Sequence, residues 1–171
     1  GKYKNRSRSV LINNWEATYF DFDEEKILSL ARKAKALGVE MFVLDDGWFG
    51  TRNDDFQGLG DWYVNMEKLP NGISGLSKKI NDLGMKFGLW FEPEMANKNS
   101  DLYRAHPDWI LSAPGRYDTS SRNQHVLDFS RSEVVDYIYE SVSKILRDAN
   151  IEYIKWDMNR CMTEVFSHTK E

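Results

Sequence analysis

A lysine and an aspartate alternate along the segment YIKWDMNR, where Lys155 and Asp157 are two residues apart. Successive side chains of a strand point to opposite faces, so Tyr153, Lys155 and Asp157 share one face. A positive charge beside a carboxyl group favours its ionised form, which a covalent glycosidase nucleophile requires. The alternative is a buried Lys–Asp ion pair that only fills the interior. Both interpretations fit the spacing.

A second acidic pair, Asp45 and Asp46, ends the apolar run in FVLDDGWFG. Buried carboxylates are costly unless they meet hydrogen-bond donors, and sugar hydroxyls are such donors. One Asp could instead cap the following turn. Carboxylates also suit magnesium or calcium, but the spacing places no third ligand, so we expect no metal site.

The run FGLWFEPEM brings Glu92 and Glu94 to either side of Pro93, which would end strand pairing. Either Glu could act as a catalytic acid, or both could support the site through hydrogen bonds. Tryptophans at strand ends could stack on a sugar face, although each could equally belong to the core; these are Trp15, Trp48 and Trp90.

Four apolar runs that could position these residues begin at Val10, Glu40, Met85 and Glu152. Between them, apolar residues recur at helical spacing over 23–37, 73–83 and 134–146. The first of these helices should begin at Asp23 and end at Gly38. The alternation predicts an α/β fold with parallel strands and helices outside the sheet.

Two architectures remain open for these strands: a complete doubly wound sheet, or half of a TIM-type (β/α)₈ barrel with about four βα units. A whole barrel takes roughly 250 residues. The G-x-G-x-x-G turn of dinucleotide folds and a P-loop are both missing from the sequence, which weakens the open sheet. We expect 58–60 to be a flexible stretch of a loop that covers substrate.

Composition excludes several other classes of function. The 171 residues carry a formal net charge of −4, so we expect no nucleic-acid partner. No apolar run approaches the ~20 residues that span a bilayer, so we expect no membrane association. The single cysteine, Cys161, excludes an internal disulfide and fits a reducing compartment. The three histidines lack ligand spacing. We therefore expect a cytoplasmic protein without a cofactor.

Six motifs in order, from about Val10 to Arg160, resemble the catalytic barrel of family-36 glycoside hydrolases, the bacterial-type α-galactosidases. They are NNWEATYFDF, FVLDDGWFG, FGLWFEPEM, HPDWIL, NQHVLDFS and YIKWDMNR. The resemblance implies a retaining mechanism with Asp157 as the nucleophile. It also implies a galactose site: Asp45 and Asp46 hold the 4- and 6-hydroxyls, Trp15 and Trp90 form aromatic walls, and Arg122, Lys155 and Asn159 make further contacts.

The resemblance also predicts what is missing. Family members carry their general acid/base on strand six, so we expect it to be absent from this chain, together with strands five to eight and the flanking domains. Residues 1–171 would form a single partial catalytic domain, inactive on its own. Its ligand would be a galactose-containing oligosaccharide of the melibiose or raffinose type. Transfer to another sugar, or a non-catalytic galactose-binding or scaffold module, are the alternatives.

Open edges would be the main physical difficulty of half a barrel. The first and fourth strands would expose unpaired backbone groups. Two copies could close an eight-stranded barrel if the fourth strand of one paired with the first strand of the other. We therefore expect a homodimer.

Overall fold

The computed structural model describes residues 3–117 and 119–169; residues 1–2, 118 and 170–171 of the domain expected over 1–171 lie outside the described residues. Its main sheet has four parallel strands in the order β1-β2-β3-β6. This order confirms the predicted α/β fold and the position of all four strands. The strands are β1 (Leu11–Asn13), β2 (Met41–Leu44), β3 (Lys86–Phe91) and β6 (Tyr153–Trp156).

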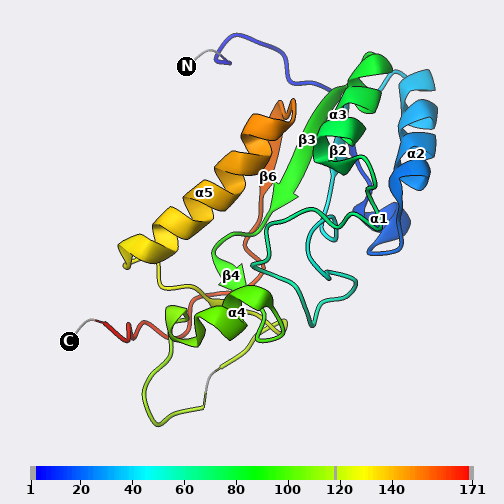
Figure 1. The fold of residues 1–171 in the computed structure, drawn as a ribbon. Coiled ribbons are helices and arrows are strands. Elements are labelled where there is room, and N and C mark those ends of the chain that lie inside the picture. Colours follow the sequence, from blue (N-terminus) through cyan, green and yellow to red (C-terminus); the bar gives the residue numbers. More distant parts are fainter. Residues whose placement is uncertain (1–2, 118, 170–171) are drawn as a thin grey trace.

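Three helices connect these strands, as the apolar periodicity predicts: α2 (Glu24–Ala36), α3 (Gly72–Asp82) and α5 (Ser132–Asp148). Helix α2 begins where the side chain of Asp23 accepts a 2.7 Å hydrogen bond from the amide of Lys26. It ends before Gly38, whose φ of +87° favours glycine. Figure 1 shows the helices alongside the strands, and α3 packs on β3 and touches both α2 and α5.

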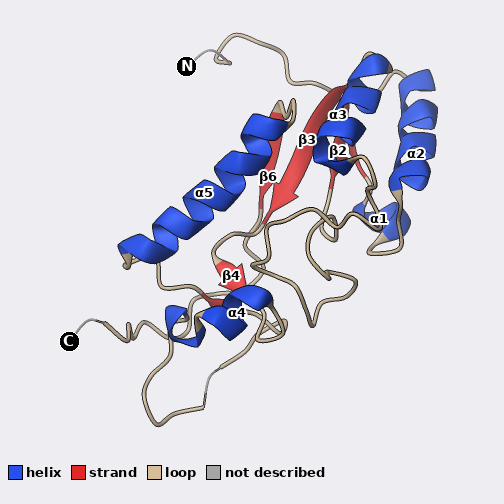
Figure 2. Ribbon diagram, viewed as in Figure 1, coloured by secondary structure: helices blue, strands red, loops and turns tan. Residues whose placement is uncertain are grey.

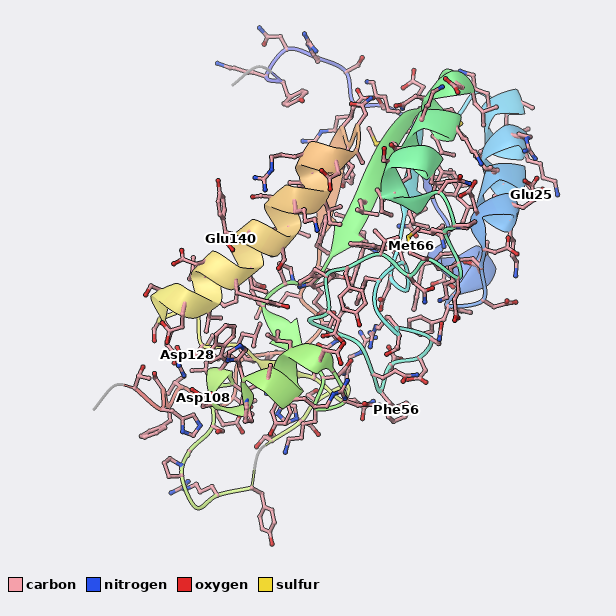
Figure 3. All side chains as sticks on the ribbon, viewed as in Figure 1. Glu25, Phe56, Met66, Asp108, Asp128 and Glu140 are labelled. Atoms are coloured by element: carbon pink, nitrogen blue, oxygen red, sulfur yellow. The ribbon has the colours of Figure 1, made fainter. Side chains whose placement is uncertain are left out.

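The core lies between the central strands and the inner faces of the helices. All four residues of β2 are buried, and so are Ile27, Ile80 and Val134 from the three helices. The opposite faces of the helices are solvent-exposed; Figure 3 shows Glu25 and Glu140 pointing away from the sheet. Edge strand β6 differs from β2 because its side chains are half-buried or exposed. The sheet is therefore well covered in its middle and open at β6.

Long connections gather at the carboxyl ends of the strands, where Figure 2 shows most of the loop segments. They contain short elements that periodicity did not predict: α1 (Trp15–Thr18), β4 (Met95–Ala96), α4 (Asp101–Ala105), the 3₁₀ helix η1 (Pro107–Trp109) and β5 (His125–Val126). Strands β4 and β5 pair antiparallel. These connections surround the carboxyl ends of the strands.

The prediction of a flexible stretch over 58–60 is wrong. Gly58, Leu59 and Gly60 are all buried. A Cβ on Gly58, whose φ is +78°, would lie 2.9 Å from the backbone nitrogen of Arg52. The glycines are required because the loop folds back tightly on itself. The exposed part of this connection lies at Phe56, which Figure 3 places at the loop tip.

No helix in 3–117 or 119–169 is long and apolar enough to cross a membrane.

Candidate active site

Asp157 lies directly after β6, where its amide donates a 2.8 Å hydrogen bond to the carbonyl of Phe91. One carboxylate oxygen, Oδ2, accepts a 3.0 Å hydrogen bond from the indole Nε1–H of Trp90. The other, Oδ1, accepts a 3.0 Å hydrogen bond from the amide of Met158. Burial raises the pKa of Asp157, but the hydrogen bonds from Trp90, Asn159 and Met158 outweigh it and hold the pKa below its ordinary value. The carboxylate is therefore ionised and oriented.

Trp90 reaches Asp157 through its N–H group and not through an open ring face. Its side chain is 2% exposed, and its ring stacks on Phe49 with an interplanar angle of 5°. Trp48 is completely buried and donates to the carbonyl of Trp90, so it belongs to the core. Trp90 therefore orients the carboxylate of Asp157. The expected aromatic wall would need an exposed ring face, whereas the ring of Trp90 is covered.

Lys155 pairs with Asp45 across the sheet, and not with Asp157 on its own strand. The distance from Lys155 Nζ to Asp45 Oδ2 is 2.8 Å. The same oxygen accepts from the side-chain amide of Asn13, and the amide of Asp45 donates to Asn14 Oδ1 at 2.8 Å. The alternative of a Lys–Asp ion pair within the YIKWDMNR segment is therefore not what forms, because the end of β2 presents the buried Asp45 carboxylate to the ammonium group. The positive charge of Lys155 still helps to lower the pKa of Asp157, as the spacing suggested.

Asp46 points to a different partner, the guanidinium group of Arg52. Arg52 Nη2 lies 2.8 Å from Oδ2, and Nε lies 3.0 Å from Oδ1. Both side chains are buried. Burial raises the pKa of Asp46 even though the Arg52 ion pair opposes it. The two adjacent acids are thus held by separate cations.

Arg122 and Asn159 meet at the exposed rim of the site. Arg122 Nη1 donates to Asn159 Oδ1 at 2.9 Å. The amide of Asn159 donates to Glu92, whose carboxylate also accepts 3.0 Å from Gln124 Nε2. Glu92 is buried, and burial raises its pKa. These contacts put Glu92 in the supporting role and leave it turned toward the protein.

Trp15 stands on the short helix α1 that follows β1, and it is half-buried. Its ring makes edge contacts with Tyr19 at 5.2 Å and Phe20 at 5.0 Å between centroids. Its amide donates to Asn13 Oδ1 at 2.8 Å, and the side-chain amide of Asn13 in turn donates to Asp45. Asn13 therefore links Trp15 to the acidic pair.

The structure thus gathers most of the predicted residues at the carboxyl ends of the strands, in bonded pairs. Two supporting residues were missed, Asn13 and Arg52. The rule that parallel strands end at one edge could have found Asn13, whereas Arg52 lies in a loop without a pattern. Within 3–117 and 119–169, no three His, Cys, Asp or Glu side chains cluster as metal ligands. The arrangement offers a nucleophile and polar partners for a polyhydroxy ligand.

An apolar cavity of about 660 Å³ lies beyond Met158, next to Phe129, Met162 and Phe166. Of the candidate residues named from the sequence, Glu94 lines this cavity, whereas Asp45, Asp46, Lys155 and Asp157 do not. Because the polar groups gather elsewhere, we place the candidate site at the strand ends and not in this cavity.

The sequence and the structure match known proteins closely. The family model described as Melibiase matches residues 1–171. α-Galactosidase AgaA from Geobacillus stearothermophilus is 60% identical over 98% of this chain and 23% of its own length, and Mel36A from Lactobacillus acidophilus is 54% identical over 96% and 22%. The crystal structure of the GH36 α-galactosidase AgaA superimposes with a TM-score of 0.97 at 59% identity, covering 100% of this chain and 24% of that one. The chain therefore spans about a quarter of these relatives, matches a part of GH36 TIM-barrel structures, and belongs to the Melibiase family of GH36 α-galactosidases.

Proposed function

We propose that this chain carries the nucleophile and one side of the sugar pocket of a retaining α-galactosidase, acting through a covalent galactosyl–Asp157 intermediate. The observation that carries the proposal is the ionised Asp157 carboxylate, held by Trp90 beside the Lys155–Asp45 pair. Crystals of AgaA variants contain raffinose and stachyose, which supports terminal α-galactosides of this type as the substrate class. We include melibiose in the same class.

The reaction begins when an oxygen of Asp157 forms a bond to the anomeric carbon and the glycosidic C–O bond breaks. The leaving oxygen needs a proton from a general acid about 5 Å from the nucleophile. Glu92 does not fit this task because its oxygens accept from Asn159 and Gln124 inside the protein. The acid/base is therefore proposed to lie outside these 171 residues. The groups proposed to bind the hydroxyls and ring of galactose are Trp15, Asp45, Asp46, Arg122, Lys155 and Asn159. Trp90 is proposed to act through Asp157, because its own ring is covered.

The test uses 5-fluoro-α-galactosyl fluoride, whose anomeric fluoride leaves without protonation. In the labelling step the bond from Asp157 to the anomeric carbon forms, the C–F bond breaks and fluoride is released. Intact mass and peptide mapping should find one fluorogalactosyl group on the peptide that contains Asp157. Asp157→Asn should abolish this label. Asp82→Asn, a change at an exposed carboxylate at the end of α3, should leave it unchanged.

Absence of the label in folded wild-type chain would contradict the proposed chemistry for this chain. Binding of 1-deoxygalactonojirimycin, a galactose-shaped ligand present in a crystal of an AgaA variant, distinguishes the alternatives. Binding without labelling would favour the galactose-binding module. Labelling followed by transfer to an added sugar, and not to water, would favour transglycosylation.

The homodimer also stays a prediction. Strands β1 and β6 are the two edges of the sheet, and Tyr153, Ile154 and Trp156 on β6 are exposed. We propose that β6 of one copy pairs with β1 of another when the chain is alone in solution. Sedimentation should show a dimer that Ile154→Lys weakens. A folded wild-type monomer at high concentration would contradict it.

A further inference from the structure

Arg52 is an almost completely buried arginine that faces two carboxylates, Asp46 and, 3.5 Å from Nη2, Asp55. It is 1% exposed. Its Nε atom donates a 3.0 Å hydrogen bond to Oδ1 of Asp46, and its Nη2 atom donates a 2.8 Å hydrogen bond to Oδ2. On its other side, Nη1 donates to the carbonyl of Gln57 at 3.1 Å and to Asn97 Oδ1 at 3.0 Å. A planar guanidinium held in this way has one orientation, and it imposes that orientation on the carboxylate.

Asn97 extends this contact to the opposite rim of the site. Its side chain is buried, and the Oδ1 atom that accepts from Arg52 also accepts a 2.9 Å hydrogen bond from the amide of Leu59. Its Nδ2 donates 2.8 Å to the carbonyl of Asn123, the residue next to Arg122. A continuous chain of hydrogen bonds, buried as far as Asn97, therefore joins Asp46 to the exposed turn that carries Arg122.

Lys68 fixes the backbone on the other side of Arg52. Its ammonium group lies 3.0 Å from the carbonyls of Phe20 and Gly47 and 3.2 Å from that of Arg52. The guanidinium carbon of Arg52 lies 5.4 Å from the centre of the Phe20 ring, which in turn contacts Trp15. Lys68 thus ties together the segments that present Trp15, Asp46 and Arg52.

We infer that Arg52 is the positioning residue of the sugar pocket: it orients the Asp46 carboxylate and, through Asn97, couples it to the Arg122 turn. The inference rests on the proposed role of Asp46 in binding galactose. Without Arg52, Asp46 would keep its burial and its neighbour Asp45, both of which raise its pKa. Two other charged groups interact with Asp46: Glu92 acts in the same direction, and Lys68 partly opposes it. The pKa of Asp46 would then rise further, and the protonated acid would lose acceptor capacity toward a sugar hydroxyl.

The experiment compares Arg52→Gln with Arg32→Gln, a change at an exposed arginine on α2. The pKa of Asp46 is followed by carboxyl carbon NMR in the full 171-residue chain. Arg52→Gln should raise it by about one unit or more, and Arg32→Gln should leave it unchanged. If Arg52→Gln does not fold, Arg52→Lys replaces it and should give a smaller rise, because its charge remains while the two-pronged contact is lost. An unchanged Asp46 titration in the folded variant would overturn the inference.

Binding of 1-deoxygalactonojirimycin provides the second measurement. Arg52→Gln should weaken binding roughly tenfold at a pH where Asp46 is protonated in the variant but ionised in the wild type. The loss should become smaller as the pH rises and Asp46 ionises in the variant as well. In an Asp46→Asn background the same substitution should change affinity less than about twofold. An equal loss in both backgrounds, or a loss that does not vary with pH, would show a merely structural role and overturn the inference. If the wild-type chain does not bind the ligand, the proposed function fails for the isolated chain, while the titration still decides the role of Arg52.

Discussion

The indole nitrogen of Trp90 on β3 and the carboxylate of Asp157 after β6 are joined by a 3.0 Å hydrogen bond. Parallel pairing aligns Trp90 with Lys155. Asp157 lies two residues beyond Lys155, which brings its carboxylate within reach of the Trp90 indole. Trp90→Phe keeps a buried ring but removes the donor. We expect the pKa of Asp157 to rise, since the lost hydrogen bond to the charged form favours ionisation. Carboxyl carbon NMR of Asp157 measures this change.

The control for Trp90→Phe is Trp109→Phe, which removes similar volume from another buried indole, one that stacks on His106. It should destabilise the fold comparably and leave the titration of Asp157 unchanged. Fluoride-trap labelling at mildly acidic pH should slow in Trp90→Phe alone. The explanation fails if both variants titrate as the wild type does.

The long elements were predictable because periodic patterns determine them. The four strands and three helices follow from apolar alternation, from Asp23 as a cap and from Gly38 as a stop. The short elements have no such pattern. Strands β4 and β5 are two residues each and depend on their pairing across the connections, such as the alignment of Met95 with Val126. Local sequence carries no signal for that pairing.

The site was predictable as a place but not as a set of contacts. The strand-end rule correctly gathers Asp45, Lys155 and Asp157. Which cation meets which acid depends on strand register, and this assigned Lys155 to Asp45. Arg52 escaped prediction because it comes from a loop whose path is determined by tertiary contacts at Gly58.

The Lys155–Asp45 ion pair should matter for stability as well as for binding. Asp45 is buried, whereas the side chain of Lys155 is 38% exposed. Lys155→Gln leaves the carboxylate with the side-chain amide of Asn13 and the backbone amide of Asp46, so we expect a loss of about 1–3 kcal/mol in the free energy of unfolding. Urea denaturation at neutral pH measures it. Lys78→Gln, at an exposed helical pair, should cost less than about 0.5 kcal/mol.

A double-mutant cycle separates the pair from its parts. If the loss comes from an uncompensated Asp45 charge, then Lys155→Gln in an Asp45→Asn background should cost clearly less than in the wild type. Equal costs in the two backgrounds would mean that Lys155 acts through packing of its methylene groups instead.

Gly88 in the centre of β3 is required by its neighbours on both sides. An added Cβ would lie 3.0 Å from Val43 Cγ2 and 3.1 Å from Tyr153 Cδ1. Gly88→Val should therefore destabilise the sheet by roughly 1–3 kcal/mol, and Gly88→Ala by less. Thermal and urea unfolding measure both. Tyr153→Ser at the exposed edge should recover part of the loss, and no recovery would contradict crowding as its cause.

Glu92 should make stability depend on pH in the sense opposite to an ion-paired carboxylate. Its pKa in the folded state is raised above the ordinary 4.5, mainly by burial. The folded state therefore binds more protons than the unfolded state. The contribution of Glu92 to the free energy of unfolding falls as the pH rises from its pKa in the unfolded state through its pKa in the folded state. Glu92→Gln removes the titration, so its stability relative to wild type should improve as pH rises through that window.

Gln124 makes this substitution structurally tolerable. Its Oε1 atom is buried and has no hydrogen-bond partner among the residues that the structure describes, while its Nε2 atom donates to Glu92. If the amide of Gln124 rotates, Oε1 can accept from the new amide at position 92, so the hydrogen bond is kept in the reverse direction. Urea denaturation of both proteins from pH 4 to pH 8 tests the expectation. A stability difference that is constant over this range would show that the pKa of Glu92 is the same in the folded and unfolded states, and would contradict the expectation.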